Sequence, residues 1–315
     1  MAFITLTLAD RDKFRAAEIS APEACSSETT FTNLFIWRSY YRAGWAEHAG
    51  CLCLIASPED EEPFGLPPVG GGDRLAALDF TMAELARLTA VPVCRRVPET
   101  LVSQARDSGR TYTAAPDRDN DDYVYLVSQL ATLGGRKMHQ KKNHYNYFVA
   151  HYQFECLPVT AGLKPELLAV QESWLATKLE RDQIPPRQMR HEAESVRALL
   201  EHLDELSLLG LAIRLGGRLE AFTLGELVRP DLALVHLEKA NPEIRGLFVA
   251  LTSHFCRALP PTVTHVNREQ DLGLPGLRKS KESLKPDHLI HKFTIAPADS
   301  GRRDLEDQRE CSGEV

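Results

Sequence analysis

The pattern of apolar and polar positions in the second half of the chain alternates between the helix period and the strand period. Residues 191–206 repeat an apolar side chain every three or four positions, which predicts an amphipathic helix. Residues 208–228 predict a β-hairpin that turns at Gly216-Gly217. Residues 231–239 are almost continuously apolar, which is typical of a central strand. Residues 288–295 are predicted to close the same sheet.

Residues 265–291 combine a strand end, a polar loop and a short helix. The helix is predicted from Pro275 to Leu284, because proline suits a first helical turn. Leu277, Lys281 and Leu284 share one helical face, so both leucines are expected to face the core with Lys281 beside them. A lysine on an apolar stripe snorkels, pairs or lines a cavity, and these alternatives stay open.

The first half contains a second basic helix, which Gly134-Gly135 introduces and which ends near His151. Its apolar face is predicted to consist of Met138, Tyr145 and Phe148, with Lys141 or Lys142 on or beside that face. One interpretation is a solvated basic surface. The other is an electropositive wall for a phosphate, a carboxylate or an RNA backbone. Residues 25–30, CSSETT, are predicted to form a turn.

Composition and charge narrow the class of protein. The 315 residues suit two domains, and 43% hydrophobic with 26% charged residues are globular values. A net charge of −7 argues against a protein that coats nucleic acid. Neither a signal peptide nor a membrane-spanning run is evident, so a cytoplasmic protein with reduced cysteines is expected. The seven cysteines are scattered and predict no metal site, and Gly70-Gly71-Gly72 lacks the Lys-Ser/Thr of a P-loop.

Four motifs together carry a family resemblance. They are GGRLEAFTLGE, HLEKANPEIRGLF and VNREQDLGLPGLRKSKESLKP in the second half, and LATLGGRKMHQKKNHYNYF in the first. They resemble the C-terminal-domain family of phosphatidylglycerol lysyltransferases over about residues 30–295. Soluble members of that family were long known only as a domain of unknown function. The family is similar to the Fem-type peptidyltransferases, which can also use aminoacyl-tRNA as donor.

The resemblance implies an α+β fold with mixed sheets, made of two tandem GNAT-like acyltransferase domains. We expect an N-terminal domain over residues 1–156, a C-terminal domain over 157–296 and a disordered tail over 297–315. The active cleft is expected at or near the junction of the two domains.

Two departures limit what the resemblance implies. The chain has no membrane-spanning flippase segment, so lipid modification does not carry over by itself. An acyl-CoA-binding GNAT has Arg/Gln-x-x-Gly-x-Gly/Ala before its central helix, where glycines let backbone N–H groups approach a pyrophosphate. Here Gly246 is present, but Phe248 replaces the second glycine and Glu243 would repel a pyrophosphate. A purely structural loop is the alternative.

Acyl transfer from an ester or thioester requires a base, oxyanion donors and cations for the donor phosphates. The predicted catalytic residues are Lys281, Glu269, Asp271 and Arg278. Lys281 and Arg278 would supply phosphate contacts or oxyanion stabilisation. Glu269 or Asp271 would hold the acceptor amine or take its proton.

The remaining candidates are binding residues. Glu238 and Lys239 end the central strand and are alternatively an exposed ion pair worth little. The predicted substrate-binding residues are Asn267, Arg268, Lys279, Glu238, Lys239, Arg136, Lys137, Lys141 and Lys142, and the donor-binding residues of the loop are Arg245 and Gly246. No tightly bound cofactor and no metal are predicted.

We therefore expect an acyltransferase or aminoacyltransferase that uses aminoacyl-tRNA or acyl-CoA as donor. Its acceptor would be an amine or hydroxyl on a small molecule, a peptide or a lipid headgroup. The alternative is a non-catalytic binding protein that holds an anionic ligand in a basic inter-domain pocket.

Overall fold

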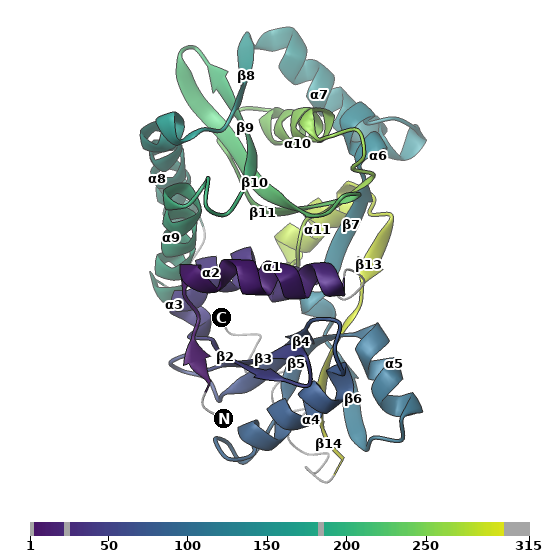
Figure 1. The fold of residues 1–315 in the computed structure, drawn as a ribbon. Helices are drawn as coiled ribbons and strands as arrows, with labels where there is room; N and C mark the ends of the chain where they lie inside the picture. The colour runs from purple at the N-terminus through teal and green to yellow at the C-terminus, as the bar shows by residue number, and fades with distance from the viewer. Residues whose placement is uncertain (1–2, 22–25, 182–185, 299–315) are drawn as a thin grey trace. The chain divides into compact units, whose positions relative to one another are not determined.

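The computed structural model describes residues 3–21, 26–181 and 186–298 (Figure 1). It contains two seven-stranded mixed sheets, each in its own compact unit. Within the described residues, the first unit comprises the chain up to Asp122, Gln270–Pro275 and everything from Leu289 onward. The second comprises Tyr123–Glu269 and Gly276–His288. Of the predicted tail, residues 299–315 lie outside the described residues.

The first unit has the strand order β1-β2-β3-β4-β5-β14-β6. The β4–β5 pair is parallel, and the other pairs are antiparallel. Its strands are β1 Ile4–Thr5, β2 Gly44–His48, β3 Cys51–Ala56, β4 Phe64–Val69, β5 Cys94–Pro98, β6 Tyr112–Pro116 and β14 Lys292–Pro297. Its helices are α1 Arg11–Ser20, α2 Phe31–Ile36, α3 Arg38–Tyr41, α4 Arg74–Leu85 and α5 Glu99–Asp107.

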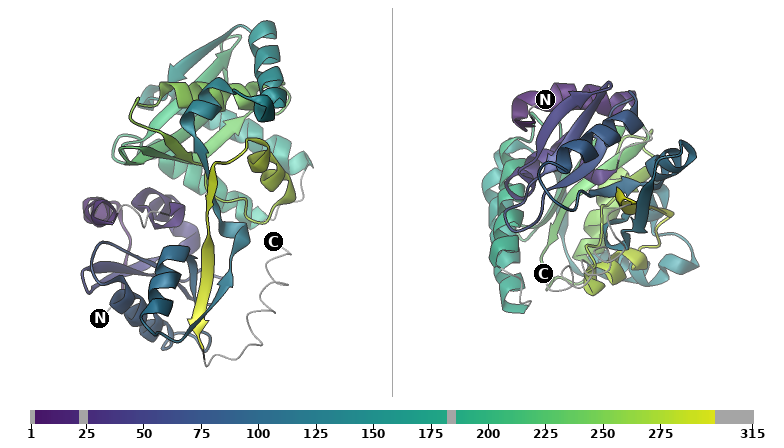
Figure 2. Two further views of the ribbon diagram at one scale, coloured as in Figure 1. Left: turned by 90° about the vertical axis from the view of Figure 1, so that its right-hand side faces the viewer. Right: turned by 90° about the horizontal axis from the view of Figure 1, so that it is seen from below.

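The last described strand corrects one sequence prediction. Residues 288–295 were expected to close the sheet of the second half, but the chain divides there between two sheets. Strand β13, His288–Ile290, joins the second sheet, whereas β14, yellow in Figure 2, lies between β5 and β6 in the first. Ile295 packs into the apolar core of the first unit. Both strands have the same hydropathy pattern, so periodicity could not assign them to different sheets.

A buried ion cluster holds β14 in that sheet. The ammonium of Lys292, whose side chain is fully buried, lies 2.7 and 2.6 Å from the two carboxylate oxygens of Glu28 and 2.6 Å from Oδ1 of Asp122. The main-chain N–H of Ser27 donates to Asp122 at 2.9 Å. Residues 26–30 of the segment predicted as a turn are therefore buried, because their polar groups find partners within the unit, whereas Cys25 lies outside the described residues.

The second unit has the strand order β13-β7-β12-β11-β10-β9-β8. Its other strands are β7 Asp122–Leu126, β8 Phe154–Pro158, β9 Leu209–Leu215, β10 Arg218–Arg229, β11 Leu232–Ala240 and β12 His265–Asn267. Its helices are α6 Val127–Thr132, α7 His139–His151, α8 Lys164–Arg181, α9 Pro186–Glu201, α10 Leu247–Ala258 and α11 Pro275–Ser283. The predicted hairpin is confirmed as β9–β10, and the predicted central strand is β11, the fourth of seven. The predicted division between residues 156 and 157 falls inside β8.

Helices cover this sheet as the apolar stripes require. Helix α8 packs against β10 and β11, and α10 packs against β9 and β10 (Figure 1). Helix α7 forms as predicted; Phe148 on this helix and Met138 directly before it are buried. The predicted helix at Pro275 also forms, and Leu284 is buried, but Leu277 is 36% exposed. Leu277 therefore does not face the core as predicted. The cause is local, because α11 is attached through its C-terminal end, where Gln129 donates to the carbonyl oxygen of Leu284.

The five described cysteines are all free thiols, as the sequence predicts. Among the described residues, no helix is both long enough and apolar enough to cross a bilayer.

Candidate functional site

The central strand of the second unit extends past its parallel neighbour. Strand β12 pairs with β11 only up to Asn267, which lies opposite Leu234. From Val235 onward, that edge of β11 has no strand partner in the described part of the chain. The side chain of His236 is fully buried while the residue as a whole is partly exposed, so the exposed part is main chain. An open strand edge presents N–H and C=O groups to a ligand.

A strained turn follows β12 and crosses this opening. Glu269 has φ +57°, a left-handed conformation that a non-glycine residue adopts only when its surroundings hold it there. Asn267, which is buried, supplies one such contact, because its Oδ1 accepts the Glu269 N–H at 2.8 Å. The turn places Arg268 against the extended part of β11.

Arg268 is a buried guanidinium with an incomplete set of partners. Its side chain is 6% exposed, and its Nε donates to Oε2 of Glu238 at 2.9 Å while Nη2 donates to the same oxygen. Within the described residues, Nη1 is buried and has no hydrogen-bond partner. Burial disfavours its charge, but Glu238 outweighs that effect and raises the pKa of Arg268. A buried donor without an acceptor is costly, so Arg268 is suited to receive an anion.

Two lysines add positive charge beside Arg268. Lys141 on α7 is half-buried, and its pKa is lowered first by burial and then by the charges of Arg268 and Lys285. Because the charges of Arg268 and Lys285 both act on Lys141, these three cations form one group. We call Lys141, Arg268 and Lys285 the cation group. Lys141 thus lies beside the apolar face of its helix, as the spacing predicts, whereas Lys142 is exposed.

Lys281 connects α11 to the strained turn. Its ammonium donates to the main-chain carbonyl oxygen of Arg268 and lies 5.7 Å from the ring centre of Tyr123. The hydroxyl of Tyr125 donates to the carbonyl oxygen of Lys281 at 2.9 Å. Of the alternatives for this lysine, the structure shows pairing with main chain.

A buried histidine, which the sequence analysis did not single out, lies behind the turn. His236 lies 3.0 Å from a carboxylate oxygen of Glu226 through Nε2 and 3.0 Å from one of Glu269 through Nδ1. Burial lowers its pKa, but the two hydrogen bonds outweigh burial and raise it to about 9. The only sequence signal is a polar residue inside the apolar run 231–239. In the described ranges no group of three His, Cys, Asp or Glu side chains is arranged to hold a metal ion.

The remaining predicted residues divide between the two units. Asp271 belongs to the first unit, where its buried carboxylate accepts from Arg118 at 3.2 Å and from the Gly273 N–H at 2.9 Å. In the second unit, Arg278 is partly buried, and the exposed residues are Arg136, Lys137, Lys142 and Lys279. Lys239 is 3% exposed; it pairs with Glu192 and lies 3.2 Å from the Trp174 ring centre. Glu238 and Lys239 thus belong to two separate buried ion pairs and do not form one exposed pair with each other.

The loop before α10 is closed by α7. Gly246 has φ +86°, and a Cβ there would lie 2.2 Å from the main-chain oxygen of His144. Arg245 lies 4.3 Å above the ring of Tyr147 on the same helix. Glycine is therefore required for close helix packing, and a carbonyl oxygen faces the end of α10 where a GNAT holds a pyrophosphate.

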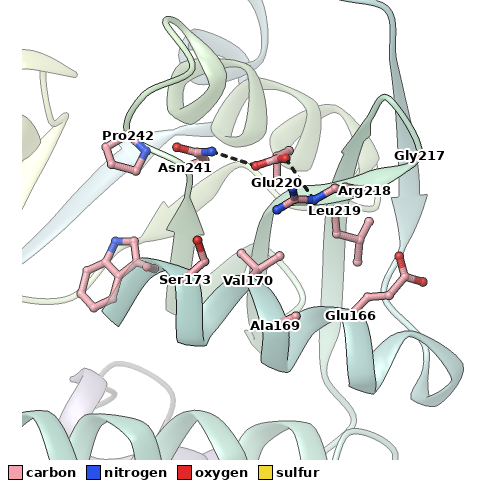
Figure 3. Close-up of a pocket in the computed structure, with 11 residues that line it drawn as sticks. Glu166, Ala169, Val170, Ser173, Gly217, Arg218, Leu219, Glu220, Asn241 and Pro242 are labelled. Atoms are coloured by element: carbon pink, nitrogen blue, oxygen red, sulfur yellow. Dashed lines mark hydrogen bonds and ion pairs between the residues drawn. The ribbon is translucent and has the colours of Figure 1, made fainter. Parts of the chain in front are cut away.

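A separate small pocket lies between α8 and the β9–β10 turn (Figure 3). Its volume is about 160 Å³, and Glu166, Glu220 and Arg218 provide its charged walls. Asn241 donates to Glu220 at 2.9 Å, and Nε of Arg218 lies 3.8 Å from a carboxylate oxygen of Glu220. Glu166 is held by Arg214 at 2.8 Å. These charges are mutually paired, and none of the lining residues belongs to the cation group.

The fold places the chain in a defined structural class. Solved structures of similar architecture can be compared with this fold of helices and two mixed sheets. One is a tandem GNAT protein from the clavulanic acid biosynthesis pathway, with a TM-score of 0.52 and 12% identity over 95% of this chain and 99% of that one. Another is FemX, with a TM-score of 0.58 and 10% identity over 93% and 97% of the two chains. The chain has a tandem GNAT-like fold.

The family follows from the sequence match. Residues 23–296 match the model for the phosphatidylglycerol lysyltransferase C-terminal family, and the chain belongs to that family. L-PGS from Bacillus licheniformis superposes with a TM-score of 0.65 at 14% identity over 96% of both chains. A conserved protein of unknown function from Bacteroides thetaiotaomicron gives 0.85 at 28% identity over 94% of this chain and 99% of that one. An uncharacterised Mycoplasmoides gallisepticum protein is 21% identical, and the match spans about half of each chain, 55% in both cases.

Proposed function

We propose that this protein is an acyl- or aminoacyltransferase whose cation group binds the anionic part of the donor. The observation that carries the proposal is Arg268, a buried guanidinium with one N–H₂ group lacking an acceptor among the described residues, placed at the open edge of β11. Lys141 and Lys285 contribute further positive charge. Membership of a lysyltransferase family and a tandem GNAT-like fold support transfer chemistry.

In the proposed reaction, the acceptor nitrogen or oxygen attacks the acyl carbonyl carbon of the donor. Glu269 accepts the proton that the acceptor loses. The tetrahedral intermediate collapses, the bond to the leaving oxygen or sulfur breaks, and the leaving group takes up a proton. The open edge of β11 offers main-chain N–H groups to the oxyanion. Lys281 holds the turn that carries both Arg268 and Glu269.

Aminoacyl-tRNA is the better supported donor. The end of α10 is covered by α7 through Gly246 and His144, so a CoA pyrophosphate lacks the usual helix terminus. Phe248 is 38% exposed beside that terminus, where a GNAT has a second small residue. Exposed Arg136, Lys137 and Lys142 extend the positive charge on and before α7, as a polyanion requires.

A non-catalytic binding protein is the second candidate, and one observation favours it. The acidic side chains near the cation group already have partners, since Glu238 pairs with Arg268 and Glu269 pairs with His236. Such a protein would bind the same donor anion and transfer nothing.

The test is a titration of the purified chain with charged tRNA and with a CoA thioester at low and moderate salt. Binding to the native state raises its melting temperature by mass action. We expect stabilisation by charged tRNA that weakens steeply with salt, and transfer of the labelled aminoacyl group to an amine acceptor. Arg268→Gln should abolish both, whereas exposed Arg87→Gln on the first unit serves as the matched control. Binding without transfer would support the second candidate. If neither charged tRNA nor the CoA thioester binds, both candidate functions are wrong.

A further inference from the structure

The imidazole of His236 is enclosed between two carboxylates on different elements. Glu226 is contributed by β10 and Glu269 by the turn after β12, and each lies 3.0 Å from a different ring nitrogen. The side chains of His236 and Glu226 are 0% and 1% exposed, whereas Glu269 is 17% exposed. The carboxylate of Glu269 therefore has a buried side, which faces the imidazole, and a side that reaches the surface.

The position of His236 depends on an irregularity in the central sheet. The register between β10 and β11 steps from Leu224 opposite Leu237 to Gly225 opposite Val235. His236 is the extra residue of this β-bulge. A bulge redirects one side chain and commonly lies next to a functional site.

The hydrogen-bond count requires a charged imidazole. A neutral histidine has one donor and one acceptor nitrogen, whereas an ionised carboxylate only accepts. Two ionised carboxylates, one at each ring nitrogen, are both satisfied only by an imidazolium. Glu238, two residues further along β11, pairs with Arg268.

Stability alone does not explain such an arrangement. Burying a cation between carboxylates costs desolvation that apolar residues of similar size would avoid. The contact between Nδ1 of His236 and the Glu269 carboxylate restricts the orientation of that carboxylate.

We propose that His236 is a positioning residue that, as an imidazolium, holds the Glu269 carboxylate in the orientation needed to meet the acceptor. This inference rests on the proposed transferase function and extends it, since an oriented carboxylate is suited to an acceptor that arrives as an ammonium group. His236 itself does not touch the substrate.

The charge of His236 is measured directly by ¹⁵N NMR of the ring nitrogens. Both nitrogens should be protonated at pH 7 and should lose that signal only as the pH approaches 9. A neutral tautomer at pH 7, or titration near the ordinary histidine value of about 6.5, would overturn the proposal. This measurement needs no substrate.

The positioning role is measured by steady-state kinetics with charged tRNA and an amine acceptor. His236→Gln should lower kcat at least tenfold with little change in KM for the donor, since the cation group is intact. The descending limb of the pH profile should lie near pH 9 in the parent chain and should move to lower pH in Glu226→Gln, which removes one of the two negative charges that raise the pKa of His236. Exposed His288→Gln is the matched control.

The outcomes separate the two ideas. If transfer occurs and both His236→Gln and Glu226→Gln keep the parent kcat and pH profile, the positioning role is wrong while the transferase function stands. If no donor supports transfer in the parent chain, the transferase function fails and the positioning role fails with it. Should His236→Gln not fold, Glu226→Gln and the NMR measurement still decide.

Discussion

Lys292 in the first unit and Arg268 in the second are both buried cations, and they differ in how completely they are paired. Lys292 in the first unit has three ammonium hydrogens and three carboxylate oxygens within 2.7 Å. Arg268 in the second unit has one carboxylate, and its Nη1 lacks an acceptor among the described residues. A fully paired buried ion specifies structure, whereas a partly paired one has binding capacity left. Lys292 thus specifies the structure of the first unit, whereas Arg268 is the candidate for ligand binding.

The largest expected effect comes from removing the fully paired cation. Lys292→Met removes the ammonium from the buried carboxylates of Glu28 and Asp122, with Arg96 remaining 3.8 Å from Glu28, which should cost about 3–5 kcal/mol of unfolding free energy. Urea denaturation of the full chain measures the loss. The triple change Lys292→Met, Glu28→Gln and Asp122→Asn should recover part of it. A change below about 1 kcal/mol for Lys292→Met would remove the distinction between the two cations.

The second expected effect separates binding from stability at Arg268. Arg268→Met leaves Glu238 buried and unpaired, so it should both destabilise the chain and weaken donor binding at least tenfold. Arg268→Met with Glu238→Met replaces the whole pair by apolar groups, which should restore most of the stability but none of the binding. Denaturation and tRNA titration are measured on the same samples. Recovery of binding in the double variant would contradict the assignment.

The smallest expected effect concerns the exposed lysines of α7. Lys142→Gln removes one phosphate contact from the proposed tRNA surface, which should reduce the slope of log binding constant against log salt by about one. Stability should change by less than about 0.5 kcal/mol, because Lys142 is exposed. Lys13→Gln, on an exposed helix of the first unit, is the control. An unchanged slope would place tRNA away from α7.

The sequence was sufficient for the elements whose signal is local. The hairpin at Gly216-Gly217, the central strand, α7 and α11 were predictable because period and turn residues determine them. Helical spacing placed Lys141 or Lys142 beside the apolar face, and in the structure Lys141 is half-buried and Lys142 is exposed. These predictions required no knowledge of distant partners.

The features that the sequence did not reveal depend on distant partners. Strand β14 has the composition of any half-buried strand, and only Glu28 and Asp122 explain why it belongs to the first sheet. His236 is informative only once the bulge and the turn at Glu269 bring two carboxylates to it. The half-partnered state of Arg268 is likewise a property of the folded unit.

The place of β14 has a consequence for synthesis. The strand lies between β5 and β6, so these two strands of the first sheet become connected only when residues 292–297 have left the ribosome. Until then, the edges of β5 and β6 that pair with β14 stay open, and the carboxylates of Glu28 and Asp122 lack the Lys292 ammonium. Folding of this unit therefore awaits residues 292–297, although most of its residues are made first. Truncation within β14 would leave both open edges exposed to aggregation.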